Sequence, residues 1–321
     1  MTPDRHDMAQ IAESAEAECM FALSHAATAQ VRAGLGMSAS RVAGGVVCTM
    51  RLARSGGFWS KALGHGFDRP LNDEALEQIL DAFRGGGVAV GAVQCSPLAD
   101  QPVLPELFTS RGLTPGRPTV KFLRPSTDLP SSHTDLDVRR VDAHSAGAFA
   151  TTYLRGYGLP PNGFFHEWFS ALPTSPGWHC FGAWEAESIV ASATLFIADD
   201  VGVLAGAATV EESRGRGAQG ALMLARMALA ADLGCRWLST ETGSETTERP
   251  NPSLHNMRRL GFTSLYERKN WIYRPREAAE LLLDEQPMPV ARRAPTCTRA
   301  LKPGRDSHRI AGVVNAVAYS A

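Results

Sequence analysis

The chain has 321 residues, 44% of them hydrophobic and 20% charged, and its formal net charge is −1. This length and composition predict about two folded domains and argue against wholesale disorder. The balanced charge gives no reason to expect binding to nucleic acid or to an anionic membrane. No apolar run reaches the roughly 18–20 residues that span a bilayer, so we also expect no membrane partner.

The N-terminus and the cysteines indicate a cytoplasmic protein. The first residues, "MTPDRHDMAQ", lack the apolar segment of a secretory signal. The cysteines are scattered and form no C-x-x-C pair, which argues against a disulfide scaffold and against a zinc site. We therefore expect no metal. The six cysteines are Cys19, Cys48, Cys95, Cys180, Cys235 and Cys297.

The first half of the chain alternates between predicted helices and strands. Good helix formers and apolar spacing predict a helix over 7–33, and β-branched residues predict a strand over 41–53. A second helix is expected over 71–83, because the glycines that follow it favour a helix end. The apolar run 88–95 then reads as a buried strand.

A segment rich in Pro, Ser and Thr, residues 126–135, predicts a linker between two domains. The second half continues with alternating strands and helices. Three strands in succession, separated by short turns, predict an antiparallel meander. The expected elements are a strand at 136–143, a helix at 144–156, strands at 178–187, 188–198 and 201–210, a helix at 216–233, a strand at 235–242, a helix at 252–262 and a strand at 265–275.

These elements predict two domains, 1–125 and 136–276, joined by the linker 126–135. The residues from 284 to 321 contain Pro and Arg with little apolar periodicity, so we expect a disordered tail there.

An internal similarity relates the two halves. Both "PELFTSRGLTPGRPTVKFLRP" (105–125) and "PSLHNMRRLGFTSLYERKNWIYRP" (252–275) run from Pro through a short helix and a glycine to a strand that ends in Arg-Pro. Gly112 and Gly261 are about 150 residues apart, a spacing comparable to one domain. Two explanations remain open: a chance likeness of two helix–glycine–strand units, or a duplication in which only the second copy has a glycine loop.

The stretch "SRGRGAQGAL" (213–222) lies between the meander and the following helix. The start of a helix has free N–H groups and a partial positive charge, and both suit a phosphate. Glycines let the backbone approach such a ligand closely. Arg214 and Arg216 add positive charge. The stretch therefore predicts an anion-binding loop.

Three ligand assignments fit this loop. Gly215, Gly217 and Gly220 match the dinucleotide pattern G-x-G-x-x-G, and Glu241 stands near the distance of its ribose-binding acid. That pattern requires a parallel βαβ unit, however, whereas this loop follows a predicted antiparallel meander. The second assignment is a solvated turn without a ligand, and the third is the diphosphate of coenzyme A.

The third assignment rests on a family resemblance. "AATVEESRGRGAQGALM", with "NPSLHNMRRLGF" downstream, resembles the GNAT superfamily of acyl-CoA N-acyltransferases, whose signature R/Q-x-x-G-x-G/A binds the diphosphate of acetyl-CoA. Arg214, Gly217 and Gln219 occupy the signature positions, with Gln219 in place of the usual Gly or Ala. The resemblance covers 136–275 and reaches the first half only through the internal similarity. It implies an α/β (α+β) fold with a mixed, mostly antiparallel sheet flanked by helices, in two tandem units of which the first is degenerate.

The resemblance also implies which residues contact acetyl-CoA. The end of the fourth strand and the loop would bind the diphosphate, and an Asn before the next helix would hold the pantetheine arm. For both Asn candidates, ordinary helix capping or turn chemistry is the alternative. The implied residues are Thr209, Val210, Arg214, Arg216, Gly217, Gln219, Gly220, Ala221, Asn251 and Asn256.

For catalysis, the resemblance points to Glu241. Some family members place a general base on the fourth strand, where this chain has Val201, and others place it on the fifth strand, where this chain has Glu241. A solvent-facing carboxylate is the alternative for Glu241. Many members have a Tyr as general acid where this chain has Met257, which has no proton to give. The aromatic segment 157–169 would shape the acceptor site or belong to the core.

The sequence thus predicts an N-acetyltransferase that uses acetyl-CoA and acts on a primary amine of a small molecule or of a protein N-terminus, with a homodimer possible. The alternatives are a non-catalytic acyl-CoA-binding or sensing protein and, less favoured, an NAD(P)-dependent oxidoreductase.

Overall fold

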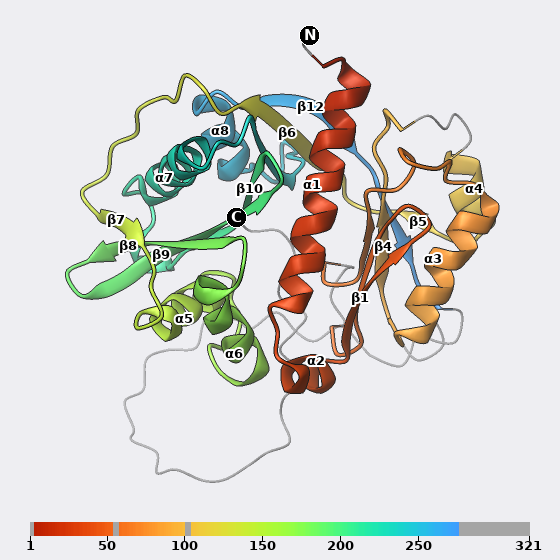
Figure 1. The fold of residues 1–321 in the computed structure, drawn as a ribbon, viewed down its shortest axis with the longest axis horizontal. Helices are drawn as coiled ribbons and strands as arrows, with labels where there is room; N and C mark the ends of the chain where they lie inside the picture. Colours follow the sequence, from red (N-terminus) through yellow and green to blue (C-terminus); the bar gives the residue numbers. More distant parts are fainter. Residues whose placement is uncertain (1–2, 54–57, 100–103, 276–321) are drawn as a thin grey trace.

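The computed structural model describes residues 3–53, 58–99 and 104–275. Its strands form two mixed sheets, one of six strands and one of seven. A long helix, α1 (Arg5–His25), lies between the two sheets (Figure 1). The fold class predicted from the sequence, two α/β units with mostly antiparallel sheets flanked by helices, is confirmed.

The first half contributes most of the six-stranded sheet. Its elements after α1 are α2 (Ala29–Leu35), β1 (Met37–Val42), β2 (Gly45–Met50), β3 (Lys61–Leu63), α3 (Asp73–Gly85), β4 (Gly91–Gln94), α4 (Leu104–Ser110), β5 (Thr114–Pro115) and β6 (Thr119–Pro125).

The second half contributes most of the seven-stranded sheet. Its elements are β7 (Asp137–Arg140), α5 (Ala146–Gly156), α6 (Gly163–Ala171), a 3₁₀ turn (Leu172–Thr174), β8 (Trp178–Glu185), β9 (Ser188–Ala198), β10 (Val201–Thr209), a second 3₁₀ turn (Glu211–Ser213), α7 (Ala218–Asp232), β11 (Trp237–Gly243), α8 (Pro252–Arg259), β12 (Thr263–Arg268) and β13 (Asn270–Tyr273). The meander β8–β9–β10 is confirmed.

Two predictions in the first half are wrong in detail. The helix expected over 7–33 is two helices, because the Thr28 side chain accepts a hydrogen bond from Val31 N–H and caps a new helix there. The strand expected over 41–53 is a hairpin, β1–β2. Ala43 and Gly44 both have positive φ at its turn, +48° and +79°, which suits a two-residue hairpin loop.

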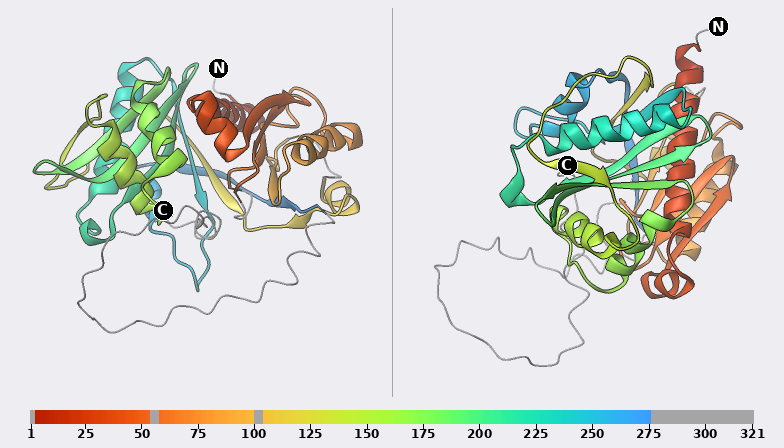
Figure 2. Two further views of the ribbon diagram at one scale, coloured as in Figure 1. Left: turned by 90° about the horizontal axis from the view of Figure 1, so that it is seen from below. Right: turned by 60° about the vertical axis from the view of Figure 1, so that its left-hand side comes forward.

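The two halves exchange one strand each. β6, from the first half, lies between β11 and β12 in the seven-stranded sheet. β13, from the second half, lies between β4 and β5 in the six-stranded sheet. The single strand expected over 265–275 is therefore two strands in different sheets, which cross between the halves (Figure 2).

The exchange follows the internal similarity of the sequence. In each half a pair of parallel strands, β3–β4 or β10–β11, is connected through one helix, α3 or α7. A second short helix, α4 or α8, then leads to the exchanged strands. This repeated topology supports duplication over chance likeness. The boundary predicted near residue 125 separates two halves of the sequence, each of which completes its sheet with a strand of the other.

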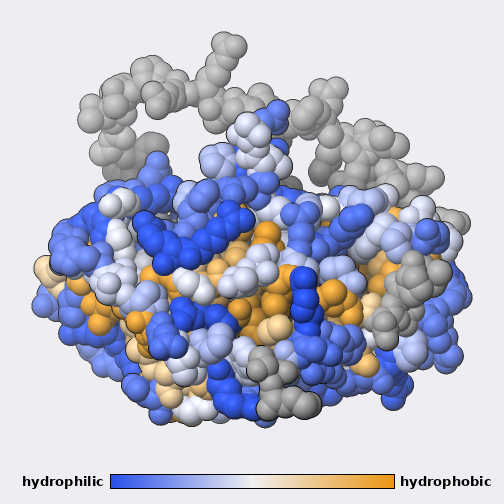
Figure 3. All heavy atoms as spheres, turned by 90° about the horizontal axis from the view of Figure 1, so that it is seen from above, coloured by the Kyte–Doolittle hydropathy of each residue, from blue (hydrophilic) through white to orange (hydrophobic). Residues whose placement is uncertain are grey.

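The largest buried apolar cluster joins the halves. It includes Val31 and Trp59 from the first half and Phe149, Trp168 and Val203 from the second. Seen from the end where α1 begins, apolar side chains show in the middle of the face between polar ones (Figure 3). Among the described residues, no helix is both long and apolar enough to cross a membrane. The tail predicted from 284 lies outside the described residues.

Candidate functional site

Two cavities meet where the parallel strands β10 and β11 separate. The strands pair only over Val201–Val203 and Trp237–Ser239. A bulge then bends β10 between Ala205 and Ala207. Beyond the bulge, residues 207–209 line a cavity of about 820 Å³ beside α7, here called the loop cavity. Residues 203–206 line a cavity of about 180 Å³ between the two halves, here called the central cavity.

The loop 213–220 offers a row of free backbone donors to the loop cavity. Within the described residues, the N–H groups of 215–220 have no hydrogen-bond acceptor, and the first bond of α7 runs from Ala221 N–H to the Gly217 carbonyl. Gly217 has φ +77°, and a Cβ there would collide with the His133 carbonyl oxygen. Six free donors at the start of a helix can bind an anion.

The charges around the loop cavity differ from those expected. Arg214 lines the cavity, but the guanidinium of Arg216 is paired with Asp135 and Glu185 and leaves only its backbone N–H to the loop. Arg117 and Arg259 also line this cavity. Sequence reasoning missed both arginines. Only the packing of α8 and of the segment before β6 brings them to the loop, and no local sequence pattern records that packing.

The predicted pantetheine and loop residues form one hydrogen-bond network. Asn251 caps α8 by accepting from Ser253 and Leu254 N–H, and its amide donates to Thr242 Oγ1 and the Gly243 carbonyl. The capping alternative therefore describes its side chain, although Asn251 lines both cavities. Gln219 donates to Ser253 Oγ (2.6 Å) and accepts from Asn256.

The remaining predicted contacts lie at the end of β10 and in the first turn of α7. The N–H of Val210 donates to the Val190 carbonyl and is not free. Thr209 and Ala207 alternate with the residues bonded to β9, so their N–H groups point away from β9. Ala221 N–H is used within α7.

Glu241, the predicted base, lies at the edge of a buried ionic network. Its Oε2 accepts from Arg268, and its two oxygens lie 3.6 Å from Lys61 Nζ and Lys121 Nζ. Arg268 also contacts two carboxylates of α1, Glu13 (2.6 Å) and Glu16 (2.9 Å). The network holds three cations and three carboxylates and is electrically balanced. It joins α1, β3, β6, β11 and β12.

The network sets the charge states of its members. Burial alone would raise the pKa of the Glu16 carboxyl, but Arg268, Lys121 and Lys61 outweigh it and lower that pKa well below its usual value. Burial would lower the pKa of Arg268, but the three carboxylates raise it well above its usual value. Both groups are therefore charged near neutral pH.

Two tyrosines of the α5 region contact the bulge of β10. The Tyr157 hydroxyl accepts from Ala207 N–H (3.1 Å) and is hydrogen-bonded to Tyr153. A Cβ at Gly206 would collide with the Tyr153 hydroxyl. Both tyrosines line the central cavity. The sequence included Tyr157 in the aromatic segment 157–169 but assigned neither tyrosine a role at β10, because their proximity to β10 arises only from the packing of α5 on the sheet.

A buried arginine of α7 stabilises the bulge. Arg226 donates to the carbonyls of Thr194 (2.9 Å) and Ala205 (2.8 Å), which face each other across β9 and β10. Burial lowers its pKa to about 10. Met257 lies buried in α8, so the position of the missing tyrosine has no proton donor.

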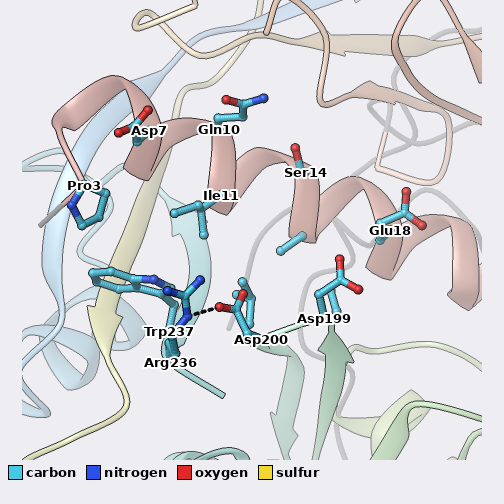
Figure 4. Close-up of a pocket in the computed structure, with 13 residues that line it drawn as sticks. Pro3, Asp7, Gln10, Ile11, Ser14, Glu18, Asp199, Asp200, Arg236 and Trp237 are labelled. Carbon is cyan, nitrogen blue, oxygen red and sulfur yellow. Dashed lines mark hydrogen bonds and ion pairs between the residues drawn. The ribbon is translucent and has the colours of Figure 1, made fainter. Parts of the chain in front are cut away.

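A third cavity lies on the other side of α1, away from the loop. It has about 530 Å³ and is lined by side chains of α1 on one side and by the Asp199–Asp200 turn, Arg236 and Trp237 on the other (Figure 4). Arg236 is already paired with Asp200. Within the described part of the chain, the one group of carboxylates and histidine close enough to hold a metal is Asp4, His6 and Asp7, at the start of α1 and outside the loop and central cavities.

Comparison with known proteins defines the fold. No family model and no curated protein matches the sequence. Among solved structures, a GCN5-related N-acetyltransferase from Kribbella flavida matches with TM-score 0.52 and 17% identity over 81% of this chain and 98% of its own. Another from Sphaerobacter thermophilus matches with TM-score 0.51 and 17% identity over 83% of this chain and 94% of its own. A tandem GNAT protein from the clavulanic acid biosynthesis pathway matches with TM-score 0.51 and 13% identity over 82% of this chain and 95% of its own.

Proposed function

We propose that this chain, which has the GCN5-related N-acetyltransferase fold in two tandem units, is an acyltransferase that moves an acetyl group from acetyl-CoA to a primary amine. One observation carries the proposal. The loop of free N–H donors and the ionisable central cavity lie on either side of the point where β10 and β11 separate.

The residues of the loop cavity fit a nucleotide diphosphate. Free N–H groups of 215–220 would bind its oxygens, and Arg214, Arg117 and Arg259 would supply positive charge. β10, α7 and β11 form one parallel βαβ unit, but the two strands pair over only three residues and β10 has the antiparallel β9 on its other side, so the doubly wound parallel sheet of a dinucleotide site is not formed here. The loop therefore supports coenzyme A over NAD(P).

When bound, acetyl-CoA supplies the thioester, whose acetyl carbon bonds to the amine nitrogen as its bond to sulfur breaks. The chain must then accept a proton from the amine and give one to the sulfur. Glu241 lines the central cavity and is the proposed acceptor, directly or through water. The N–H of Ala207 donates to the Tyr157 hydroxyl and so orients this hydroxyl beside the same cavity.

Tyr157 is the proposed proton donor in place of Met257. Its oxygen accepts from Ala207 N–H and its hydroxyl lines the central cavity, so its own proton would be given to a ligand there. Burial raises the pKa of Tyr157, so it keeps that proton at neutral pH.

Tyr157→Phe tests this role. We expect kcat to fall by about 10²-fold, the lower end for general acid catalysis, with unchanged affinity for coenzyme A. Thermal unfolding checks that the variant folds. Tyr273→Phe is the matched control, because Tyr273 is also buried but lies in β13, outside both cavities. An unchanged kcat in Tyr157→Phe would show that the sulfur leaves without this donor.

Ligand-dependent unfolding tests the proposed function itself. Acetyl-CoA at about 100 times its Kd should stabilise the protein by roughly 2.7 kcal/mol, visible as a shift of several degrees in Tm. NAD and NADP should give no shift. A shift with either dinucleotide and none with acetyl-CoA would refute the acyltransferase, and a shift with acetyl-CoA without turnover of any amine would favour the sensing protein.

A backbone variant locates the ligand. Gly217→Ala places a Cβ against the His133 carbonyl and should displace the loop. We therefore expect acetyl-CoA no longer to raise the Tm of this variant. Gly234→Ala is the control, because Gly234 has a similar φ of +83° but open space around it. Both substitutions put alanine in the left-handed region and carry similar strain. If acetyl-CoA raises the Tm of both variants equally, the ligand binds elsewhere.

A further inference from the structure

We propose that the central cavity binds an acceptor amine that carries an aromatic ring, with the ring among aromatic side chains and the amine beside Glu241. This inference rests on the proposed function, because it names the substrate class of the same site.

The walls of the cavity are aromatic and come from both halves of the chain. Trp59, before β3, lies 6.2 Å from Phe169 of α6 between ring centroids. Phe169 in turn stacks on Tyr153 at 4.5 Å. Phe58 and Trp178 add two further rings to the lining. Aromatic walls favour a flat apolar group, because offset and edge-on ring contacts add to the burial of apolar surface.

The volume of the cavity fits one such ring. The cavity measures about 180 Å³. A dry protein cavity of about 150 Å³ suffices for benzene, so a phenyl ring fits with little space to spare. An acetyl group alone would leave most of this volume empty, and an empty cavity of this size loses packing contacts.

Two buried donors in the wall have no acceptor. The indole N–H groups of Trp59 (6% exposed) and Trp178 (3% exposed) find no hydrogen-bond partner in the described part of the chain. Buried polar groups are nearly always paired, so such donors point to an absent acceptor. A hydroxyl or ether oxygen on the ring of the ligand would provide it.

The charges around the cavity indicate that the bound aromatic ring belongs to the acceptor amine and not to the acyl group. The carboxylates of Glu16 and Glu241 line the cavity together with Lys61 and Lys121, and all four belong to the balanced ionic network. The Glu241 side chain is the most exposed of the network, 24% against 8% or less for the other members, so an arriving amine, which is protonated in water, meets its carboxylate first. An acyl group is uncharged and gains nothing from these side chains.

The test measures binding separately from turnover. Titration calorimetry of the full chain with coenzyme A present compares tyramine and phenethylamine with propylamine, a primary amine without the ring. We expect both ring amines to bind at least about tenfold more tightly than propylamine. Activity with acetyl-CoA should show the same order in kcat/KM. Equal binding of the three amines, or better use of benzoyl-CoA with propylamine than of acetyl-CoA with phenethylamine, would overturn the proposal.

Three matched variants test the donors. Trp59→Phe and Trp178→Phe keep a ring but remove the N–H, so each should weaken tyramine binding about tenfold relative to phenethylamine. Trp184→Phe removes another buried indole N–H that has no partner among the described residues and lies outside the cavity. It should change the affinity for neither tyramine nor phenethylamine. If Trp184→Phe weakens tyramine binding as much as the other two variants do, the indole N–H groups of Trp59 and Trp178 do not bind the ligand.

The two proposals fail in different ways. Ring amines that bind tightly but are never acetylated would refute the acyltransferase and leave the binding inference standing. Amines that are acetylated without any preference for a ring would refute the inference and leave the acyltransferase standing.

Discussion

Replacing Glu241 with glutamine is expected to lower kcat by about 10²- to 10⁴-fold, the range for losing a general base. Glutamine keeps the size and the hydrogen bond to Arg268 but cannot take a proton from the amine. Glu13 and Glu16 still hold Arg268, so the fold should persist. Steady-state kinetics with acetyl-CoA and phenethylamine measures the loss, and titration with coenzyme A should show unchanged affinity.

Glu245→Gln is the control for that substitution. Glu245 lies four residues along the chain, and its side chain is 28% exposed against 24% for Glu241, but it lines neither the loop nor the central cavity. The kcat of Glu245→Gln should stay within about threefold of the parent, because the charged partners of Glu245, His255 and Arg258, also lie outside both cavities. An unchanged kcat in Glu241→Gln would assign Glu241 to the ionic network alone. A loss of coenzyme A affinity would indicate a structural effect on the cleft.

Replacing Arg268 with methionine is expected to destabilise the protein by about 3–5 kcal/mol, because it leaves buried carboxylates without their partner. Arg268 is fully buried and contacts Glu13, Glu16 and Glu241 at once. It sits on β12 and binds α1, so its loss weakens the contact between the two halves. Chemical denaturation measures the change, which corresponds to a Tm lowered by roughly 10 °C.

Arg236→Met is the control for Arg268. Its side chain is 76% exposed and, among the described residues, pairs with Asp200 alone, so its loss should change the free energy of unfolding by less than about 0.5 kcal/mol. If Arg268→Met is as stable as the parent, the network does not hold the halves together.

The same network predicts sensitivity to acid. The pKa of Glu16 is lower in the folded protein than its usual value of 4.5. Its stabilising contribution is therefore complete above about pH 4.5 and is lost as the pH falls toward the folded value. Denaturation curves between pH 7 and 3 should show this loss in the parent and a smaller one in Arg268→Met.

The sequence by itself determined the local elements and the loop. Three successive strands separated by short turns predicted the meander β8–β9–β10, and the glycines of 213–222 located the start of α7, because both depend on contacts between near neighbours. The internal similarity also pointed to a repeated unit, and the resemblance in the second half identified the fold.

Only the tertiary structure decided how the halves combine and what surrounds Glu241. The exchange of β6 and β13 depends on pairing between strands more than 100 residues apart, which no local pattern records. The same packing brings Arg268, Lys61 and Lys121 to Glu241, and Tyr157 and Trp59 to the cavity. Side-chain chemistry at a site is set by neighbours in space, and these neighbours come from β3, β6 and β12 and from the segments just before β3 and just after α5.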